Sequence, residues 1–169
     1  MGHYGYVTIK HATASTFVFA NIDGGWRLGL ILHPLLGKLM IPGGHVERDE
    51  NEAEAAGREV AEETGLAVTF LPAPTAPAPP EVVATGKLAS PPWWIIEQPI
   101  GADNHVAEPH VHVDHLYVAI ATVPESLTTP AHPFGWHEPA ELANLNMFDD
   151  TRQFAFALFV GLDTFEPQS

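Results

Sequence analysis

Two runs rich in β-branched and aromatic residues, 14–22 (ASTFVFANI) and 26–33 (WRLGLILH), stand near the start of the chain. Such runs are typical of β-strands. The tripeptide DGG at 23–25 separates them and predicts a hairpin, because Asp and Gly tolerate the positive φ angles of a tight turn. A third, shorter strand is predicted at 38–41. It leads into PGG at 42–44, where glycine allows the backbone to approach a ligand closely.

A helix is predicted between Asp49 and Gly65. Asp49 can cap the first turn, and Glu52, three residues later, completes a capping-box pattern. Gly65 favours termination of the helix at its carboxyl end. Small and apolar residues recur inside it at spacings of three and four, which places them on one stripe that faces a core. These residues are Ala53, Ala56, Val60 and Thr64.

The rest of the pattern alternates further strands and helices with irregular connectors. Strands are predicted at 67–71, 93–97 and 110–122, a short helix at 139–143 and a longer helix at 149–162. The proline-rich segment 72–80 predicts a stiff exposed connector, and 99–109 predicts a loop that overhangs the site. This mixture indicates an α/β (α+β) chain.

One face of the predicted strand at 110–122 changes from polar to apolar along its length. His110, His112 and Asp114 occupy alternate positions, and apolar residues continue the same face. We expect His112 and Asp114 to lie near a cleft and to be candidates for substrate binding. Polar residues at the entrance of an ordinary strand are an equal alternative. A further alternative is a separate Fe, Zn or Ni site of a cupin-like protein, since imidazole and carboxylate suit these metals.

The predicted helix carries Glu59, Glu62 and Glu63 at positions i, i+3 and i+4. Their carboxylates project from the same part of the helix and repel one another. A divalent cation removes this repulsion, and hard oxygen ligands suit Mg²⁺ (or Mn²⁺), which is commonly shared between carboxylates and substrate phosphates. The alternative is a solvated acidic face.

Length, charge and composition limit the classes of function. A chain of 169 residues predicts a single domain, 1–169. The formal net charge is −14 with only 7 Lys and Arg residues, which argues against a nucleic-acid polymer as partner. The absence of cysteine excludes disulfides and thiol catalysis. Neither a signal-like nor a membrane-spanning run is present, so we expect a cytoplasmic protein with no membrane partner.

The spacing of the glycine, acidic and basic residues from Gly44 to Leu66 resembles the Nudix box in every fixed position. The family's pattern is G-x5-E-x7-R-E-U-x-E-E-x-G-U, where U is a bulky aliphatic residue. The matching residues here are Gly44, Glu50, Arg58, Glu59, Val60, Glu62, Glu63, Gly65 and Leu66.

This resemblance implies a Nudix fold, in which a mixed β-sheet is sandwiched between α-helices and the box forms a loop–helix–loop. It also implies hydrolysis of the pyrophosphate linkage of a nucleoside diphosphate derivative by attack of water on phosphorus. A nucleoside triphosphate, ADP-ribose or another nucleotide sugar, and a dinucleoside polyphosphate all fit this class. Dimers are common in the family, so a homodimer is a further expectation.

Residue roles follow from the same resemblance. Glu62 and Glu63 are expected to bind metal, Glu59 to be a ligand or the base that orients water, and the main chain at Gly44 to contribute to the metal site.

The resemblance further implies a supporting ion pair between Glu50 and Arg58. A Nudix-like module that only binds nucleotides is the alternative function. Such modules usually lack acidic box residues, and none is missing here. An isomerase on this fold would use a cysteine, which this chain lacks.

Overall fold

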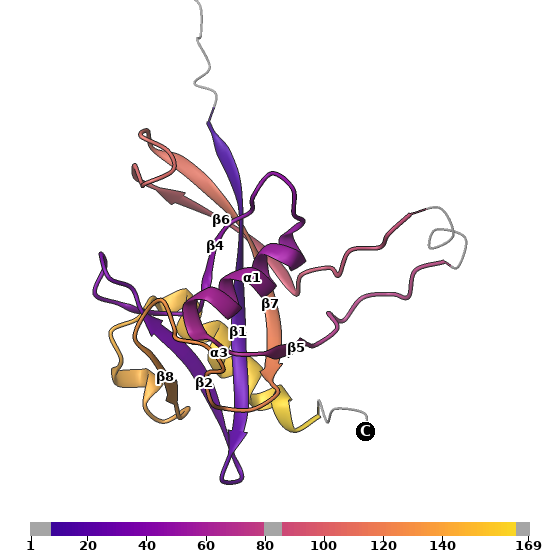
Figure 1. The fold of residues 1–169 in the computed structure, drawn as a ribbon, viewed down its shortest axis with the longest axis vertical. Coiled ribbons are helices and arrows are strands. Elements are labelled where there is room, and N and C mark those ends of the chain that lie inside the picture. The colour runs from indigo at the N-terminus through magenta and orange to yellow at the C-terminus, as the bar shows by residue number, and fades with distance from the viewer. Residues whose placement is uncertain (1–7, 80–85, 165–169) are drawn as a thin grey trace, which may run out of the picture.

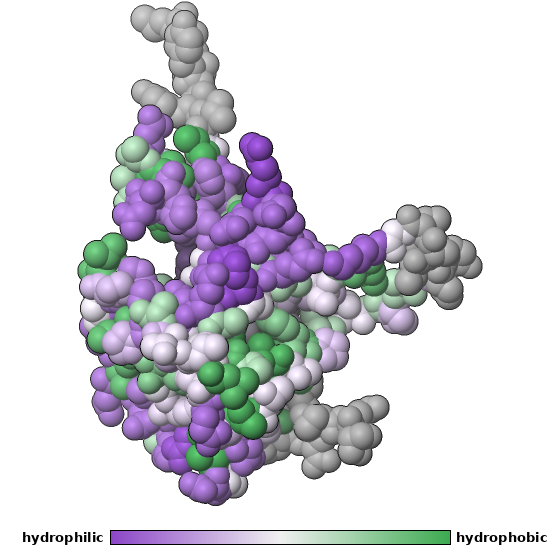
Figure 2. Space-filling view, in the orientation of Figure 1, coloured by the Kyte–Doolittle hydropathy of each residue, from purple (hydrophilic) through white to green (hydrophobic). Residues whose placement is uncertain are grey.

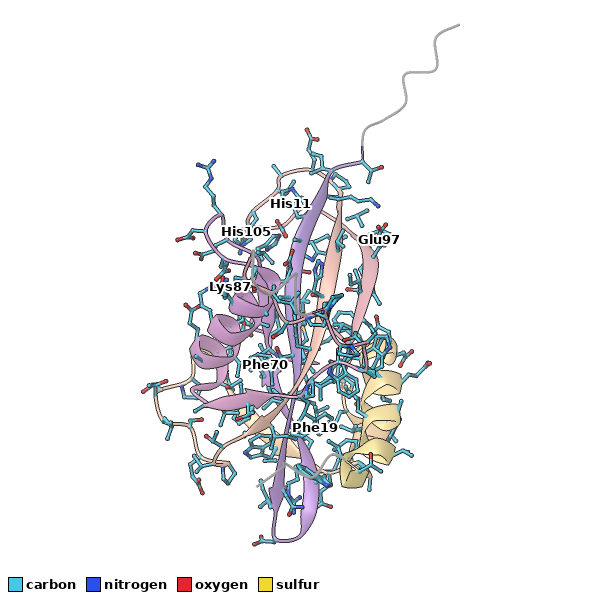
Figure 3. The ribbon with its side chains drawn as sticks, turned by 90° about the vertical axis from the view of Figure 1, so that its right-hand side faces the viewer. His11, Phe19, Phe70, Lys87, Glu97 and His105 are labelled. Carbon is cyan, nitrogen blue, oxygen red and sulfur yellow. The ribbon has the colours of Figure 1, made fainter. Side chains whose placement is uncertain are left out.

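A mixed eight-stranded sheet with a helix on each face forms the protein (Figures 1 and 3). This arrangement confirms the expected fold, a mixed sheet between helices. The computed structural model describes residues 8–79 and 86–164. In chain order the elements are β1 (Lys10–Ile22), β2 (Gly25–Leu32), β3 (Leu39–Met40), β4 (Gly43–His45), α1 (Glu52–Thr64), β5 (Val68–Phe70), β6 (Trp94–Ile100), β7 (His110–Ala121), β8 (Phe134–His137), the 3₁₀ turn η1 (Leu142–Asn144), α3 (Asp149–Gly161) and the 3₁₀ turn η2 (Leu162–Thr164).

Two long parallel strands, β1 and β7, form the centre of the sheet and stay in register from Lys10↔Val111 to Phe19↔Ile120. Each of them changes its outer partner halfway. The first half of β1 pairs with β4 and its second half with β2. The first half of β7 pairs with β6 and its end with β5. The amino-terminal halves of β1 and β7 therefore form a separate end of the sheet, flanked by β4 and β6.

The hairpin between β1 and β2 has the predicted turn. Asp23 and Gly24 adopt φ angles of 53° and 83°, and Gly25 already pairs with Ile22 as part of β2. Positive φ at both central positions matches the twist of the two flanking strands.

Helix α1 begins two residues later than the sequence predicts, so the expected cap at Asp49 is wrong. Asn51 is the N-cap, and its side chain accepts hydrogen bonds from N–H groups of the first turn. Its own N–H donates to the Glu54 carboxylate at 3.0 Å. The side chain of Glu50, just before the cap, accepts hydrogen bonds from the Glu47 N–H and from Arg58 instead of taking part in the helix. The predicted stop at Gly65 is confirmed by its left-handed φ of 69°.

The two helices cover opposite faces of the sheet, as the edge-on view of Figure 3 shows. On α1 the buried stripe contains Ala55 in place of the predicted Ala53, which is only partly buried. Small side chains allow α1 to approach β1 closely. On the other face, α3 buries Leu158 against a cluster that includes Phe17 and Phe19.

Other boundaries differ modestly from the predictions. Strand β6 extends to Ile100, which shortens the loop to 101–109. The helix predicted at 139–143 is a single 3₁₀ turn, η1. The connector at 72–79 has no regular structure and runs out from the sheet (Figure 1), and its last predicted residue, Pro80, lies outside the described residues. Of the helices in the described part of the chain, none has the length and apolar character needed to cross a membrane.

Candidate active site

Strand β4 brings the two glycines at the start of the acidic motif against α1 and β1. A Cβ atom at Gly44 would collide with the Glu59 carboxylate, and a Cβ atom at Gly43 would collide with Ser15 and with the main chain of β1. Only glycine therefore fits at both positions without displacing a neighbour. The close approach places a backbone strand directly against the acidic face of α1, which Figure 2 shows as a hydrophilic surface.

Main-chain groups alternate in direction along β4. The carbonyl of Pro42 and the N–H of Val46 both bond to β1, at 2.9 and 3.1 Å, so Gly44 between them also turns its main-chain groups toward β1. Gly43 is turned the other way, and its N–H donates to the Glu63 carboxylate at 2.9 Å. The carbonyl that faces away from β1, on the side of the carboxylates, is therefore that of Gly43.

Glu63 is the most enclosed carboxylate of the acidic face, with a side chain only 12% exposed. Burial raises its pKa to about 7, and the nearby charges of Glu59 and Glu62 add to the rise, while the bond from Gly43 opposes it. The Nε2 atom of His132 lies 3.4 Å from the same carboxylate. The ionised form of Glu63 is therefore unfavourable unless a cation is close.

Arg58 connects the acidic residues to the loop that precedes α1. Its Nε and Nη2 atoms donate to the two carboxylate oxygens of Glu50 at 3.0 and 2.7 Å, and Nη2 also donates to the carbonyl of His45 at 3.0 Å. Its Nη1 donates to Glu59 at 2.7 Å, with Glu62 farther away at 3.4 Å. The expected Glu50–Arg58 ion pair is present, and the paired guanidinium lowers the pKa of Glu50.

An open cavity of about 490 Å³ lies between β4, α1 and the loop 101–109. Glu59 and Glu63 line it, whereas Glu62 does not and has a side chain 58% exposed. The structure thus brings two of the three predicted carboxylates to one cavity and leaves the third beside it. The lining residues are Gly43, Gly44, His45, Val46, Glu47, Arg58, Glu59, Glu63 and His105.

A comparison with known protein families decides the identity of this arrangement. The pattern of the NUDIX domain matches residues 26–158. The chain belongs to the NUDIX family. It is a hydrolase that acts on pyrophosphate bonds.

Solved structures of NUDIX proteins resemble the chain over most of its length. A NUDIX family hydrolase from Clostridium perfringens is 25% identical with a TM-score of 0.68, over 90% of this chain and 97% of that one. An Ap4A hydrolase from C. elegans is 16% identical with a TM-score of 0.61, over 90% and 99%. The NUDIX domain of Shewanella oneidensis NrtR, complexed with ADP ribose, is 17% identical with a TM-score of 0.58, over 95% and 94%. The last two show the fold alone. Among curated protein sequences, none matches the chain significantly.

The two predicted residues on β7 lie in different surroundings. Asp114 is buried and accepts hydrogen bonds through Oδ1 from Thr13 at 2.9 Å and from Ser15 at 3.0 Å. Burial raises its pKa. His112 instead contacts other imidazoles, with its ring centroid 4.7 Å from that of His45. Burial lowers the pKa of His112, and that of His45 to about 4, so both rings are neutral at neutral pH.

Asp114 lines a second cavity, of about 390 Å³, on the face of the sheet that α3 covers. Most of its wall is apolar and includes Phe17, Phe148 and Phe154. Gly43 lines both cavities, so they meet at β4.

Sequence reasoning did not find four residues of this region. His45 follows the first box glycine directly, but its role was hidden because the box leaves its position free. Asp103 and His105 lie in the loop that was expected to overhang the site. A carboxylate and an imidazole in such a loop are a signal from which they could have been named as candidate site residues. His132 comes from a distant loop, and no local pattern indicates its contact with Glu63.

Proposed function

We propose that this NUDIX hydrolase uses Mg²⁺ (or Mn²⁺) to cleave the pyrophosphate linkage of a nucleoside diphosphate derivative, by attack of water on phosphorus. The observation that carries the proposal is the convergence of Glu59 and Glu63 beside the glycine strand, with a pKa of about 7 for Glu63. A carboxylate with the raised pKa of Glu63 needs a nearby cation to be fully ionised at neutral pH.

The residues present fit a hard divalent ion. Glu59 and Glu63 supply carboxylate oxygens in one cavity, and Glu62 lies at its margin. The outward carbonyl of Gly43 makes a better main-chain ligand than that of Gly44, which faces β1. Oxygen donors of this type suit Mg²⁺ and Mn²⁺. When bound, such an ion neutralises pyrophosphate oxygens and lowers the pKa of the attacking water.

The remaining groups of the cavity orient these carboxylates. Arg58 fixes one oxygen of Glu59, so this carboxylate has a defined direction for binding metal or for accepting a proton from water. The bidentate pair with Glu50 fixes Arg58 in turn. The Nε2 atom of His132, from a loop outside α1, lies 3.4 Å from the Glu63 carboxylate. We assign both Arg58 and Glu50 as positioning residues.

The cavity of about 390 Å³ is the proposed site for the nucleoside part of the substrate. Its volume is within the range of ligand pockets, and its aromatic wall suits a base. Asp114 and Ser15 supply polar groups to its wall. Because Gly43 borders both cavities, a diphosphate can reach the carboxylates while the nucleoside lies against α3. The substrate class stays broad and includes nucleoside triphosphates, nucleotide sugars such as ADP-ribose, and dinucleoside polyphosphates.

The test is release of phosphate or nucleotide from a panel of these three classes with Mg²⁺ or Mn²⁺. Wild type is compared with Glu62→Gln and with Glu125→Gln, a control at an exposed glutamate outside both cavities. We expect selective turnover that is lost in Glu62→Gln and kept in Glu125→Gln. Normal turnover in Glu62→Gln would reject its assignment as a metal ligand.

If wild type hydrolyses no compound of the panel but is thermally stabilised by nucleotide, the alternative of a module that only binds nucleotides would be favoured. The cupin-like alternative is already excluded by the fold, since the described strands form one open sheet. A cytoplasmic location and a homodimer remain predictions.

A further inference from the structure

Three imidazoles and one carboxylate converge at the end of the sheet next to the active site. They come from β4 (His45), from the loop 101–109 (Asp103) and from the start of β7 (His110 and His112). One ligand atom from each residue lies within 4.8 Å of the ligand atoms of all the others. The proposed hydrolysis makes no use of this group. Figure 3 shows His105 of the same loop at this end of the molecule, far from Phe19 in the core.

Strand register separates this cluster from the box carboxylates. His45 pairs with Thr13 of β1, and Thr13 pairs with Asp114, so these residues share a face of the sheet with His112. Ala14, the neighbour of Thr13, points to the opposite face and packs against α1. The imidazoles and the acidic helix therefore lie on opposite faces of the sheet, with β4 between them.

Distances within the cluster match the spacing of ligands around one small ion. Asp103 Oδ2 lies 3.4 Å from Nε2 of His110, 3.4 Å from Nε2 of His112 and 3.8 Å from Nε2 of His45. The two Nε2 atoms of His110 and His112 are 3.2 Å apart. In a tetrahedral site with bonds of about 2.0–2.1 Å, neighbouring ligand atoms are about 3.3–3.4 Å apart. The distances between Asp103, His110 and His112 are already close to this spacing, whereas His45, whose ligand atom lies within 4.8 Å of the others, must move inward to complete the tetrahedron.

Hydrogen bonding leaves one nitrogen of the cluster without a partner among the described residues and directs the lone pair of another into the cluster. Nε2 of His45 is buried and makes no hydrogen bond in the described part of the chain. The ring of His110 is fully buried, and its Nδ1 lies 2.9 Å from the carbonyl of Glu108. A neutral imidazole has one N–H, so donation by Nδ1 leaves the Nε2 lone pair directed into the cluster. A backbone carbonyl on Nδ1 is the usual support of a metal-binding histidine.

We propose that His45, Asp103, His110 and His112 bind a divalent transition-metal ion of the zinc type, at a site separate from the box carboxylates. Three nitrogens and one oxygen suit Zn²⁺ in tetrahedral geometry, whereas Mg²⁺ prefers six oxygen ligands. The bound ion connects the loop 101–109 to β4 and β7. His105 of this loop lies against His45, with ring centroids 4.1 Å apart, and lines the same cavity as Glu59. The ion therefore fixes one wall of the active site.

The test is calorimetric titration of the metal-free full chain with Zn²⁺ alone, and separately with Mg²⁺ alone. Four variants are compared with wild type: His112→Ala, Asp103→Asn, the double box variant Glu59→Gln/Glu63→Gln, and His137→Ala. The last removes a histidine of β8 outside the cluster. Asp103→Asn changes a loop residue without altering its volume, so it tests the site even if His112→Ala does not fold, which circular dichroism would show.

We expect a Zn²⁺ site that survives in the double box variant and in His137→Ala, and whose affinity falls more than about 100-fold in His112→Ala, beyond the effect of losing an outer-sphere partner. Asp103→Asn should also weaken it. Co²⁺ bound there should show the strong visible absorption of a tetrahedral complex in the double box variant. Loss of Zn²⁺ binding in the double box variant, or unchanged binding in both cluster variants, would overturn the proposal. So would the absence of Zn²⁺ binding in wild type.

Discussion

The N–H of Gly43 donates a 2.9 Å hydrogen bond to the carboxylate of Glu63. This bond joins β4 to the last turn of α1, so the start and the end of the acidic motif meet although the chain between them forms a loop and a helix. The bond helps to keep this largely buried carboxylate in place, yet it does not offset the effect of burial, which raises the pKa of Glu63 to about 7. A measurable pH dependence follows.

In metal-free protein, Glu63 should destabilise the fold as the pH rises. Its pKa is about 7 when folded and 4.5 ordinarily, so the stabilising contribution of its protonated form is complete below pH 4.5 and is lost as the pH rises through 7. Urea unfolding of EDTA-treated wild type and Glu63→Gln measures this. Across that interval we expect the free energy of unfolding of wild type to fall by on the order of 3 kcal/mol relative to the variant. Parallel pH profiles would contradict the burial of this carboxylate.

Replacement of Arg58 should reduce both stability and rate. Arg58→Ala leaves the carboxylates of Glu50 and Glu59 without their donor, at a site where the arginine side chain is only 24% exposed. We expect a loss of about 2–3 kcal/mol in the free energy of unfolding, somewhat less than for a fully buried pair. Arg58→Lys keeps the charge but cannot make the bidentate pair, so it should recover only part of the loss. A lysine variant equal to wild type in both stability and rate would show that the forked geometry is unimportant.

A methyl group at Gly44 should displace the Glu59 carboxylate, because the added Cβ would collide with it. We expect Gly44→Ala to cost about 1–3 kcal/mol in stability and to reduce turnover by about 100-fold, as is typical when a reacting group moves by about 1 Å.

Gly57 offers a matched control on α1. An added Cβ there meets only Phe70, at an ordinary 3.7 Å. Gly57→Ala should therefore raise stability by up to about 1 kcal/mol and leave turnover unchanged. If the two alanine variants behaved alike in a turnover assay, the close approach at Gly44 would have no catalytic importance.

Asp114→Asn should weaken substrate binding more than catalysis. The carboxylate lines the second cavity and keeps Oδ2 free of the bonds from Thr13 and Ser15, which both go to Oδ1. Loss of one charged hydrogen bond to a nucleoside raises KM by about 10-fold or more. Asp23→Asn, in the distant hairpin, is the control. A fall in kcat at unchanged KM would place Asp114 outside the nucleoside site.

Local chemistry made the motif and the hairpin predictable, whereas contacts between distant segments were not. The box spacing and Gly65 suffice to predict α1, since a helix is determined by residues close in sequence. The predicted cap is wrong because Asp49 and Asn51 are equally good capping residues by type; in the fold Asn51 is the cap, and Glu50 between them is held by Arg58. That contact forms only in the folded chain.

The imidazole cluster shows the same limit. The alternation His110-x-His112 is visible in the sequence, where Asp114 is expected as a substrate-binding candidate and, in the alternative of a metal site, as its third member. In the fold Asp114 bonds to β1 hydroxyls, and Asp103 and His45 join the histidines instead. Their approach depends on the pairing of β4 with β1 and on the path of the loop 101–109. No spacing along the chain encodes that arrangement.

The most direct test of the active-site assignment is turnover of the substrate identified by the panel, measured at graded Mg²⁺ concentrations in wild type, Glu63→Gln and Glu125→Gln. We predict that wild type and Glu125→Gln require Mg²⁺ and behave alike, and that kcat of Glu63→Gln falls by at least about 100-fold, as for the loss of one group that stabilises transition-state charge. A folded Glu63→Gln protein with wild-type turnover and wild-type Mg²⁺ dependence would contradict the assignment of the box carboxylates as the metal-binding centre.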